Sequence, residues 1–317
     1  MINLRYHIVS LVAVFLALAL GIVMGSTVID KAIVDELRDR VDSVSDRAAR
    51  TDGENRALRG RLDLMDGFAN EARDQLVLGR LRNIPVLVVT VQGVDRKPVE
   101  AVRDTLAAAQ AVPAGTLLFT NKLRLDNEND TRALAAVLNT SPAQLPETIR
   151  RLALTRLAAM LEGSSADGGL LPALAAGGFV GYEPPPPATT TTTTIGLGSF
   201  PVSNLRILLV SGAGAEVGDD RLAVPFAQSL VAQAPTVQGS RLVAAESGQD
   251  TPGGRAVFVG PLRVDTTVST KLSTVDNLES PIGQAAAVLA LDDLDVARLG
   301  SYGVGPGAQR LLPSLEP

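Results

Sequence analysis

The sequence IVSLVAVFLALALGIVMGSTV, residues 8–28, contains no charged side chain. A helix rises about 1.5 Å per residue, so roughly 20 residues cross a hydrocarbon core about 30 Å thick. The run is therefore predicted to be a transmembrane anchor. A cleaved signal peptide is the alternative, but no A-x-A-like site follows Met24 directly and the helical pattern continues through this point.

The charges beside the anchor predict its orientation. Arg5 and the α-amino group precede it, whereas Asp30, Lys31, Asp35 and Glu36 follow it. The positive-inside rule then places the N-terminus in the cytoplasm and the rest of the chain beyond the cell membrane. If the run were instead a cleaved signal peptide, the outer membrane would be the alternative location.

Three small residues lie one turn apart in the anchor: Ala17, Gly21 and Gly25. Small residues at this spacing permit close helix approach, which would suit a dimer continuous with the segment that follows. Small residues are also common in membrane helices in general, so the pattern is weak by itself.

Residues 29–82 are predicted to form a coiled coil, because apolar residues recur there with a period of seven. The a positions are Val34, Val41, Ala48, Asn55, Leu62, Ala69 and Leu76, and the d positions are Leu37, Val44, Thr51, Leu58, Met65, Ala72 and Gly79. Asn55 is a polar residue at an a position. Such a residue fixes the register of a coiled coil and favours two helices, at a cost in the stability of the coiled coil. We predict a marginal parallel homodimer. The alternative is a single helix lying on its own domain.

Composition excludes several kinds of site. The 317 residues carry a net charge of −5, which gives no basic field for nucleic acid. Cysteine is absent and His7 is the only histidine, so disulfides, thiolate metal sites and Cys nucleophiles are excluded. Copper(I) prefers Cys, Met or His, and the four methionines form no cluster along the sequence.

Residues 83–317 alternate between strand and helix patterns. Strands are predicted at 86–91, 115–120, 205–210, 241–245 and 256–259, with a short one ending at Phe179-Val180, and helices at 97–110, 130–138, 146–161, 222–234 and 281–291. Alternation of this kind predicts an α/β fold, here a doubly wound, Rossmann-like domain with a mainly parallel sheet. A Pro/Thr-rich insert, 184–194, either interrupts one six-stranded sheet, which we favour, or separates two small domains.

No catalytic or cofactor site stands out. The loop Gly212-Ala-Gly-Ala-Glu-Val-Gly218 follows a strand but has GxGxxxG spacing rather than GxGxxG, so a tight loop is favoured over a dinucleotide site. Asp219-Asp220 and Asp292-Asp293 are interpreted as helix-end carboxylates rather than acid/base pairs. We therefore predict a protein that is not an enzyme and has no cofactor.

The opening INLRYHIVSLVAVFLALALGIVMGS, the segment STVDNLESPIGQ at 273–284 and the SYG at 301–303 resemble the actinobacterial MctB family over essentially the full chain. The resemblance implies copper transport, through a channel in the mycobacterial outer membrane that limits intracellular copper. Related SteB proteins are coiled-coil membrane proteins that pair with a membrane partner, SteA, in cell division and control of peptidoglycan hydrolysis. The resemblance alone marks Asp276, Asn277 and Gln284 as a candidate functional surface. Otherwise the segment is a helix N-terminal turn capped by Ser280.

The residues favour the SteB-like alternative. One uncharged helix followed by α/β alternation supplies none of the amphipathic strands, about ten residues long, of a membrane barrel. The predicted function is a dimeric, membrane-anchored scaffold linked to copper homeostasis. A pore for copper efflux is the second hypothesis and an extracytoplasmic enzyme the third.

Overall fold

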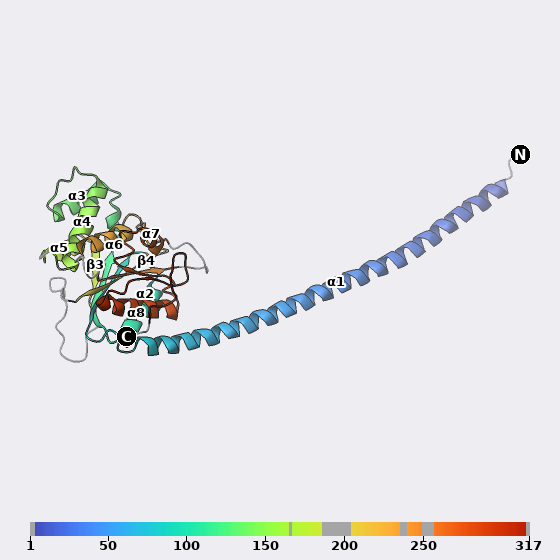
Figure 1. The fold of residues 1–317 in the computed structure, drawn as a ribbon. Coiled ribbons are helices and arrows are strands. Elements are labelled where there is room, and N and C mark those ends of the chain that lie inside the picture. The colour runs from blue at the N-terminus through green and yellow to red at the C-terminus, as the bar shows by residue number, and fades with distance from the viewer. Residues whose placement is uncertain (1–3, 165–166, 186–203, 235–239, 249–256, 315–317) are drawn as a thin grey trace. The chain divides into compact units, whose positions relative to one another are not determined.

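A computed structural model describes residues 4–164, 167–185, 204–234, 240–248 and 257–314 (Figure 1). The chain divides into two compact units, Met1–Met65 and Asp66–Pro317. The Pro/Thr-rich insert from residue 186 onward and Ala256 of the predicted 256–259 strand lie outside the described residues.

The N-terminal helix α1 spans Leu4–Val77 without a break. Its segment Arg5–Gly25 is long and apolar enough to cross a membrane, with a mean hydropathy of 2.8. This confirms one N-terminal apolar helix. The helix ends earlier than the coiled coil predicted to residue 82, because Gly79 has a φ of 69° and belongs to the turn that follows.

The described strands form one seven-stranded sheet with the order β3-β2-β1-β4-β5-β6-β7. Neighbouring strands are parallel except β2 and β3. The mixed α/β fold with a mostly parallel sheet is therefore confirmed. The strands are β1 Pro85–Val91, β2 Val112–Phe119, β3 Val180–Glu183, β4 Arg206–Gly212, β5 Leu242–Ser247, β6 Ser273–Val275 and β7 Ser301–Tyr302.

Helices lie on both sides of this sheet (Figure 1). Helices α2 and α8 pack together on one side, and α4, α6 and α7 lie on the other. The helices after α1 are α2 Arg96–Ala108, α3 Glu128–Val137, α4 Pro146–Leu161, α5 Leu170–Ala176, α6 Ala223–Gln233, α7 Val259–Val264 and α8 Pro281–Asp293, with short 3-10 turns at Asn121–Arg124 and Leu294–Val296. The apolar strands β1 and β4 are buried in the centre.

Two strand predictions are wrong. The short strand expected to end at Phe179-Val180 begins at Val180, as β3. Val257 and Phe258 form a bend and Val259 begins α7, where residues 256–259 were expected to be extended. The buried carboxylate of Glu246 accepts hydrogen bonds from all three backbone N–H groups, at 2.6, 3.2 and 2.9 Å. A carboxylate that binds consecutive free N–H groups stabilises the start of a helix, so this segment begins α7, with Phe258 and Val259 buried and Val257 exposed.

Candidate functional site

The first candidate surface is an apolar stripe on α1, which we call the stem seam. It comprises Val34, Leu37, Val41, Val44, Asn55, Leu58, Leu62 and Met65. Its apolar side chains are exposed in the single chain, from 44 % at Val34 to 69 % at Met65. A contiguous exposed stripe of this kind typically marks an interaction surface. Asn55 donates a hydrogen bond to the carbonyl of Thr51 at 2.9 Å, within its own helix.

Near the end of α1 the heptad positions pack against the α/β body of the same chain. Ala69, Ala72 and Leu76, at predicted a and d positions, are partly buried, and the adjacent Val77 is completely buried in the hydrophobic core. From Ala69 onward the helix thus packs on its own α/β body. This part of α1 follows the alternative prediction, a single helix lying on its own domain. The part of the seam that stays exposed ends at Met65.

Polar contacts hold this helix end in place. Arg73 donates from Nη1 to Oε1 of Gln284 on α8 at 2.8 Å, and its side chain is only 17 % exposed. Just after the helix, the fully buried Leu81 donates its backbone N–H to the carbonyl of Ala109 at 3.0 Å. Arg80 pairs with Asp292 at 3.5 Å.

The small residues of the anchor do not continue the stem seam. A helix turns about 100° per residue, so Gly25 and Val34, nine positions apart in an unbroken helix, project in nearly opposite directions. Gly21 and Ala17 lie on the same side as Gly25. The expected dimer that uses both surfaces at once is therefore incompatible with a straight α1.

Asp276 is a buried node of the fold, contrary to its predicted place on a functional surface. Its carboxylate has no exposed area and pairs with Arg263 at 2.7 Å. The same carboxylate accepts the N–H groups of Val304 at 2.7 Å and Gly305 at 3.1 Å. Arg263 in turn donates to the carbonyl of Tyr302 at 2.7 Å. The node therefore ties α7, β6 and β7 together.

Two of the segments that carry the family resemblance, 273–284 and 301–303, meet at this node. A Cβ on Gly303, where φ is 122°, would lie 2.1 Å from an Asp276 carboxylate oxygen, so only glycine fits. Asn277 has a φ of 59° and is partly exposed. Gln284 is 4 % exposed and bonds Leu278 as well as Arg73, so it is also not a surface residue.

Ser280 caps α8, as the alternative reading of the segment predicted. Its hydroxyl accepts the N–H of Gly283 at 3.0 Å, and Pro281 occupies the first helical turn. A Ser cap followed by proline is a common helix start, because it binds a free N–H group and sets φ in advance.

The glycine-rich loop after β4 packs against protein backbone. A Cβ on Gly212 would lie 2.2 Å from the carbonyl of Ser247, and one on Gly214 would lie 2.7 Å from the carbonyl of Gly93. These glycines are thus required by close backbone packing, as the tight-loop interpretation predicted.

The same sheet edge carries a polar clasp between the loops after β1, β2 and β4. Glu216 accepts the side-chain amides of Asn121 at 2.9 Å and Gln92 at 3.3 Å. The backbone N–H of Asn121 donates to the side-chain oxygen of Gln92 at 3.0 Å. In many open α/β sheets this edge holds a ligand, and here the clasp joins the loops across it.

Two acidic groups are buried at the carboxyl ends of β4 and β5. The Ser211 hydroxyl donates to Asp219, which is 8 % exposed, and Glu246 is 1 % exposed. Burial raises the pKa of Asp219 to about 6, with a smaller upward contribution from the charge of Asp220 and a downward one from Ser211. Burial likewise raises the pKa of Glu246, to which Asp219 adds. Asp219 is thus a buried group rather than a solvated helix cap.

Replacing Asp219 with Asn is expected to stabilise the protein above pH 6. A carboxyl group whose pKa is higher in the folded state binds a proton more tightly there. Its contribution to the stability of the folded protein is therefore favourable at low pH and is lost as pH rises through about 4 to 6. A shift of this size corresponds to about 2–3 kcal/mol. Urea unfolding followed by pulse proteolysis should show Asp219→Asn more stable than wild type at pH 8.

That gain should shrink at pH 4.5, where the wild-type carboxyl is largely protonated in the folded protein. Asn retains an oxygen that can accept the Ser211 hydroxyl, so the substitution isolates the charge. Asp104→Asn on the exposed side of α2 is the control and should leave stability nearly unchanged at both pH values. Equal stability of wild type and Asp219→Asn at pH 8 would contradict the buried charge.

The acidic group at the end of α8 pairs with arginines. Asp293 contacts Arg298 at 3.2 Å, and Asp295 contacts Arg206, which also donates to the carbonyl of Leu291. Arg206 is 2 % exposed at the start of β4. These contacts attach the end of α8 to the sheet.

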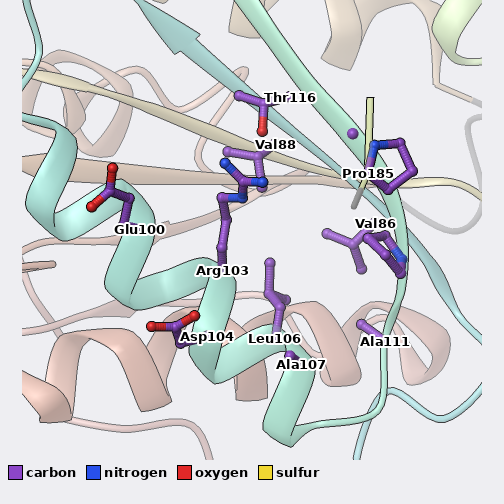
Figure 2. Close-up of a pocket in the computed structure, with 12 residues that line it drawn as sticks. Val86, Val88, Glu100, Arg103, Asp104, Leu106, Ala107, Ala111, Thr116 and Pro185 are labelled. Carbon is purple, nitrogen blue, oxygen red and sulfur yellow. The ribbon is translucent and has the colours of Figure 1, made fainter. Parts of the chain in front are cut away.

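A pocket of about 250 Å³ lies between α2 and the strands β1 and β2 (Figure 2). Val86, Val88 and Leu106 give it an apolar lining, and Arg103 extends from α2 toward Thr116 in Figure 2. Arg103 also pairs with Glu183 at 3.2 Å. The pocket was not predictable from the sequence, because its lining comes from segments that only folding brings together.

Soft metal ligands are scattered over the chain. Met24 is exposed in the apolar segment, Met65 lies at the end of the stem seam and Met160 is buried on α4. Within the described ranges, no group of three or more His, Cys, Asp or Glu side chains has a geometry suited to a metal ion. With no cysteine and one histidine, the chain's donor set does not fit a copper(I) site built from one copy.

Comparison with known proteins gives a match over nearly the whole chain. The family model described as "Copper transport outer membrane protein, MctB" matches residues 1–313. The copper transporter MctB of Mycobacterium tuberculosis is 27 % identical over 332 residues, which cover 99 % of this chain and 100 % of that protein. The copper transporter MctB of Mycobacterium leprae is 29 % identical over 326 residues, covering 97 % of this chain and 98 % of that protein.

Proposed function

The chain belongs to the MctB family, and we propose that it acts in copper homeostasis of the cell envelope as a membrane-anchored, dimeric scaffold without enzymatic activity. In this proposal the N-terminus is cytoplasmic and the α/β body lies beyond the cell membrane. Copper is the cargo or physiological target of the system rather than a resident cofactor. The names of the family and of its mycobacterial relatives support the link to copper.

The observation that carries the scaffold proposal is the exposed stem seam on an unbroken helix. Helix α1 contains both the apolar segment Arg5–Gly25 and the stripe from Val34 to Met65. In a coiled coil each a or d side chain enters a hole formed by the partner helix, which removes it from water. A second copy anchored in the same membrane presents the same seam in parallel and would cover it.

The proposal also assigns a role to the α/β body and names the kind of partner that it binds. We propose a doubly wound, Rossmann-like body that acts as a recognition domain, with a SteA-like membrane protein as its partner in cell division and control of peptidoglycan hydrolysis. The clasp of Gln92, Asn121 and Glu216 joins the loops at the sheet edge where such folds commonly bind ligands, which favours recognition by an outer surface.

Replacing Asn55 with Val is expected to strengthen self-association and to relax its limit to two copies. A buried polar residue at an a position lowers stability while selecting dimers, and a β-branched residue there packs well. Chemical cross-linking of the full chain in membranes should give more cross-linked product and species above the dimer.

Asn70→Val is the matched control for Asn55→Val. Asn70 makes the same kind of bond, from its amide to the carbonyl of Asp66 at 2.9 Å, but lies one position beyond the a residue Ala69. Its replacement should leave the cross-linking pattern unchanged. An unchanged pattern for Asn55→Val as well would count against the coiled coil.

The whole proposal is tested by locating the α/β body relative to the membrane and by measuring whether two copies of the stem seam lie close together. The chain has no cysteine, so Leu58→Cys introduces a single reporter on the stem seam. Protease treatment of intact cells and spheroplasts should place the body outside the inner membrane, and oxidation should give a disulfide-linked dimer. Outer-envelope protein that lacks the first 25 or so residues would instead favour the copper-efflux pore, the alternative that the family description supports.

A further inference from the structure

The charges beside the stem seam identify the alignment of its partner. With Val34 at position a, the e positions include Asp52, Arg59 and Asp66, and the g positions include Arg47, Glu54 and Arg61. In a parallel coiled coil, a g residue faces the e residue five positions later on the partner helix. We propose that two copies pair in exact heptad register through complementary charges. This inference rests on the dimer proposed above.

Three successive g–e contacts are complementary in this alignment. Each charged side chain is exposed in the single chain, and within the described residues none of the six forms an ion pair. Residues five positions apart on one helix point in different directions, so these charges meet only between copies. The contacts join Arg47 to the partner's Asp52, Glu54 to the partner's Arg59 and Arg61 to the partner's Asp66.

Sliding one helix by a heptad replaces attraction by repulsion. Along one side of the slipped pair, Arg47 faces the partner's Arg59 and Glu54 faces the partner's Asp66, and only Arg40 gains an opposite charge, the partner's Asp52. Along the other side of the same pair, Glu54 faces the partner's Asp52 and Arg61 faces the partner's Arg59. Like charges that face one another disfavour an alignment, so these residues select against the slip on both sides of the pair.

The apolar side chains of the stem seam distinguish poorly between registers, so the charged pairs matter for the alignment of the two helices. Ala48 and Thr51 bury little area, so the seam between Val44 and Asn55 distinguishes registers poorly by packing. The charged pairs at Arg47 and Glu54 flank this weak part. Because both copies are anchored at the same end, antiparallel pairing is not available to them in a membrane.

Exchange of one charge pair tests the alignment directly. Glu54→Arg and Arg59→Glu each create two like-charge contacts in their own homodimer, whereas a mixed dimer of the two variants keeps two attractive contacts. Co-expressed full-length copies of different size, each also carrying Leu58→Cys, should therefore form mixed disulfides about 5- to 30-fold above the statistical ratio at low salt. The preference should fall toward statistical in 1 M NaCl.

A second reporter pair reads register independently of charge. Thr51→Cys and Leu58→Cys lie one heptad apart on the seam. In the in-register dimer, oxidation links like positions, and a 51–58 disulfide between copies forms only after a slip. Arg56→Glu reverses a charge away from the e and g positions, and its mixing with the Arg59→Glu copy should show no preference.

The outcomes separate this inference from the dimer itself. A statistical ratio of mixed disulfides at low salt, or a 51–58 disulfide as strong as the 58–58 disulfide, would overturn the proposed alignment while the dimer stands. Loss of every intermolecular disulfide in the otherwise wild-type chain carrying Leu58→Cys would instead remove the dimer and the proposed function with it.

Discussion

Asp276→Ala is expected to lower the free energy of unfolding of the α/β body by about 3–5 kcal/mol, because it leaves the Arg263 guanidinium buried without its counter-charge. The two side chains are 3 % and 0 % exposed. The backbone N–H groups of Val304 and Gly305 would lose their acceptor as well. The urea midpoint of the full chain in detergent, measured by pulse proteolysis, should fall strongly.

Two further variants test the same node. Gly303→Ala should also destabilise strongly, because its Cβ would overlap the Asp276 carboxylate in a backbone conformation that favours glycine. Asp126→Ala is the control, since this exposed carboxylate pairs with the exposed Arg124 and such pairs contribute about 0–1 kcal/mol. If Asp276→Ala unfolded at the same urea concentration as Asp126→Ala, the buried ion pair would be disproved.

Leu58→Glu is expected to weaken dimerisation by 100-fold or more. Full burial of a leucine contributes about 1.5–3 kcal/mol, and a symmetric dimer loses two such side chains, or about 3–6 kcal/mol. Each factor of ten in Kd corresponds to about 1.4 kcal/mol, and the introduced carboxylates would repel one another. Sedimentation equilibrium of the full chain in density-matched detergent should show mainly monomer.

Leu64→Glu provides a control with the same chemistry. Leu64 is 76 % exposed and lies two positions after the a residue Leu62, on the outer side of the predicted coil. Its replacement should leave the dimer intact. Equal association of both variants and the wild type would show that the stem seam is not the contact surface.

Much of the architecture was predictable because it depends on local patterns. The uncharged run of residues 8–28 and the apolar strand near Val86 are recognisable from composition alone, and the βαβ unit follows from the order of segments. The Ser280 cap was also predictable, since capping involves neighbours within three residues. The short strands β6 and β7 were missed because three and two residues carry too little periodicity.

The candidate site was predicted less well, because its errors concern partners distant in sequence. Asp276 was placed on a surface from the resemblance of its segment, whereas its role depends on Arg263 and on the chain that follows β7. The heptad pattern of α1 continues past Met65, but burial of Val77 against the body shows where a second helix can no longer cover it.

The sequence by itself determined the N-terminal apolar helix through its composition and length, and the heptad stripe and the α/β alternation through the period of the backbone. Only the tertiary structure decided which polar groups are buried and what they bind. Glu246 caps the start of α7, and Arg73 reaches Gln284 across 211 positions of sequence. Such contacts are set by how the elements pack, and the favourable pairing of a buried charge exists only once packing has removed water from it.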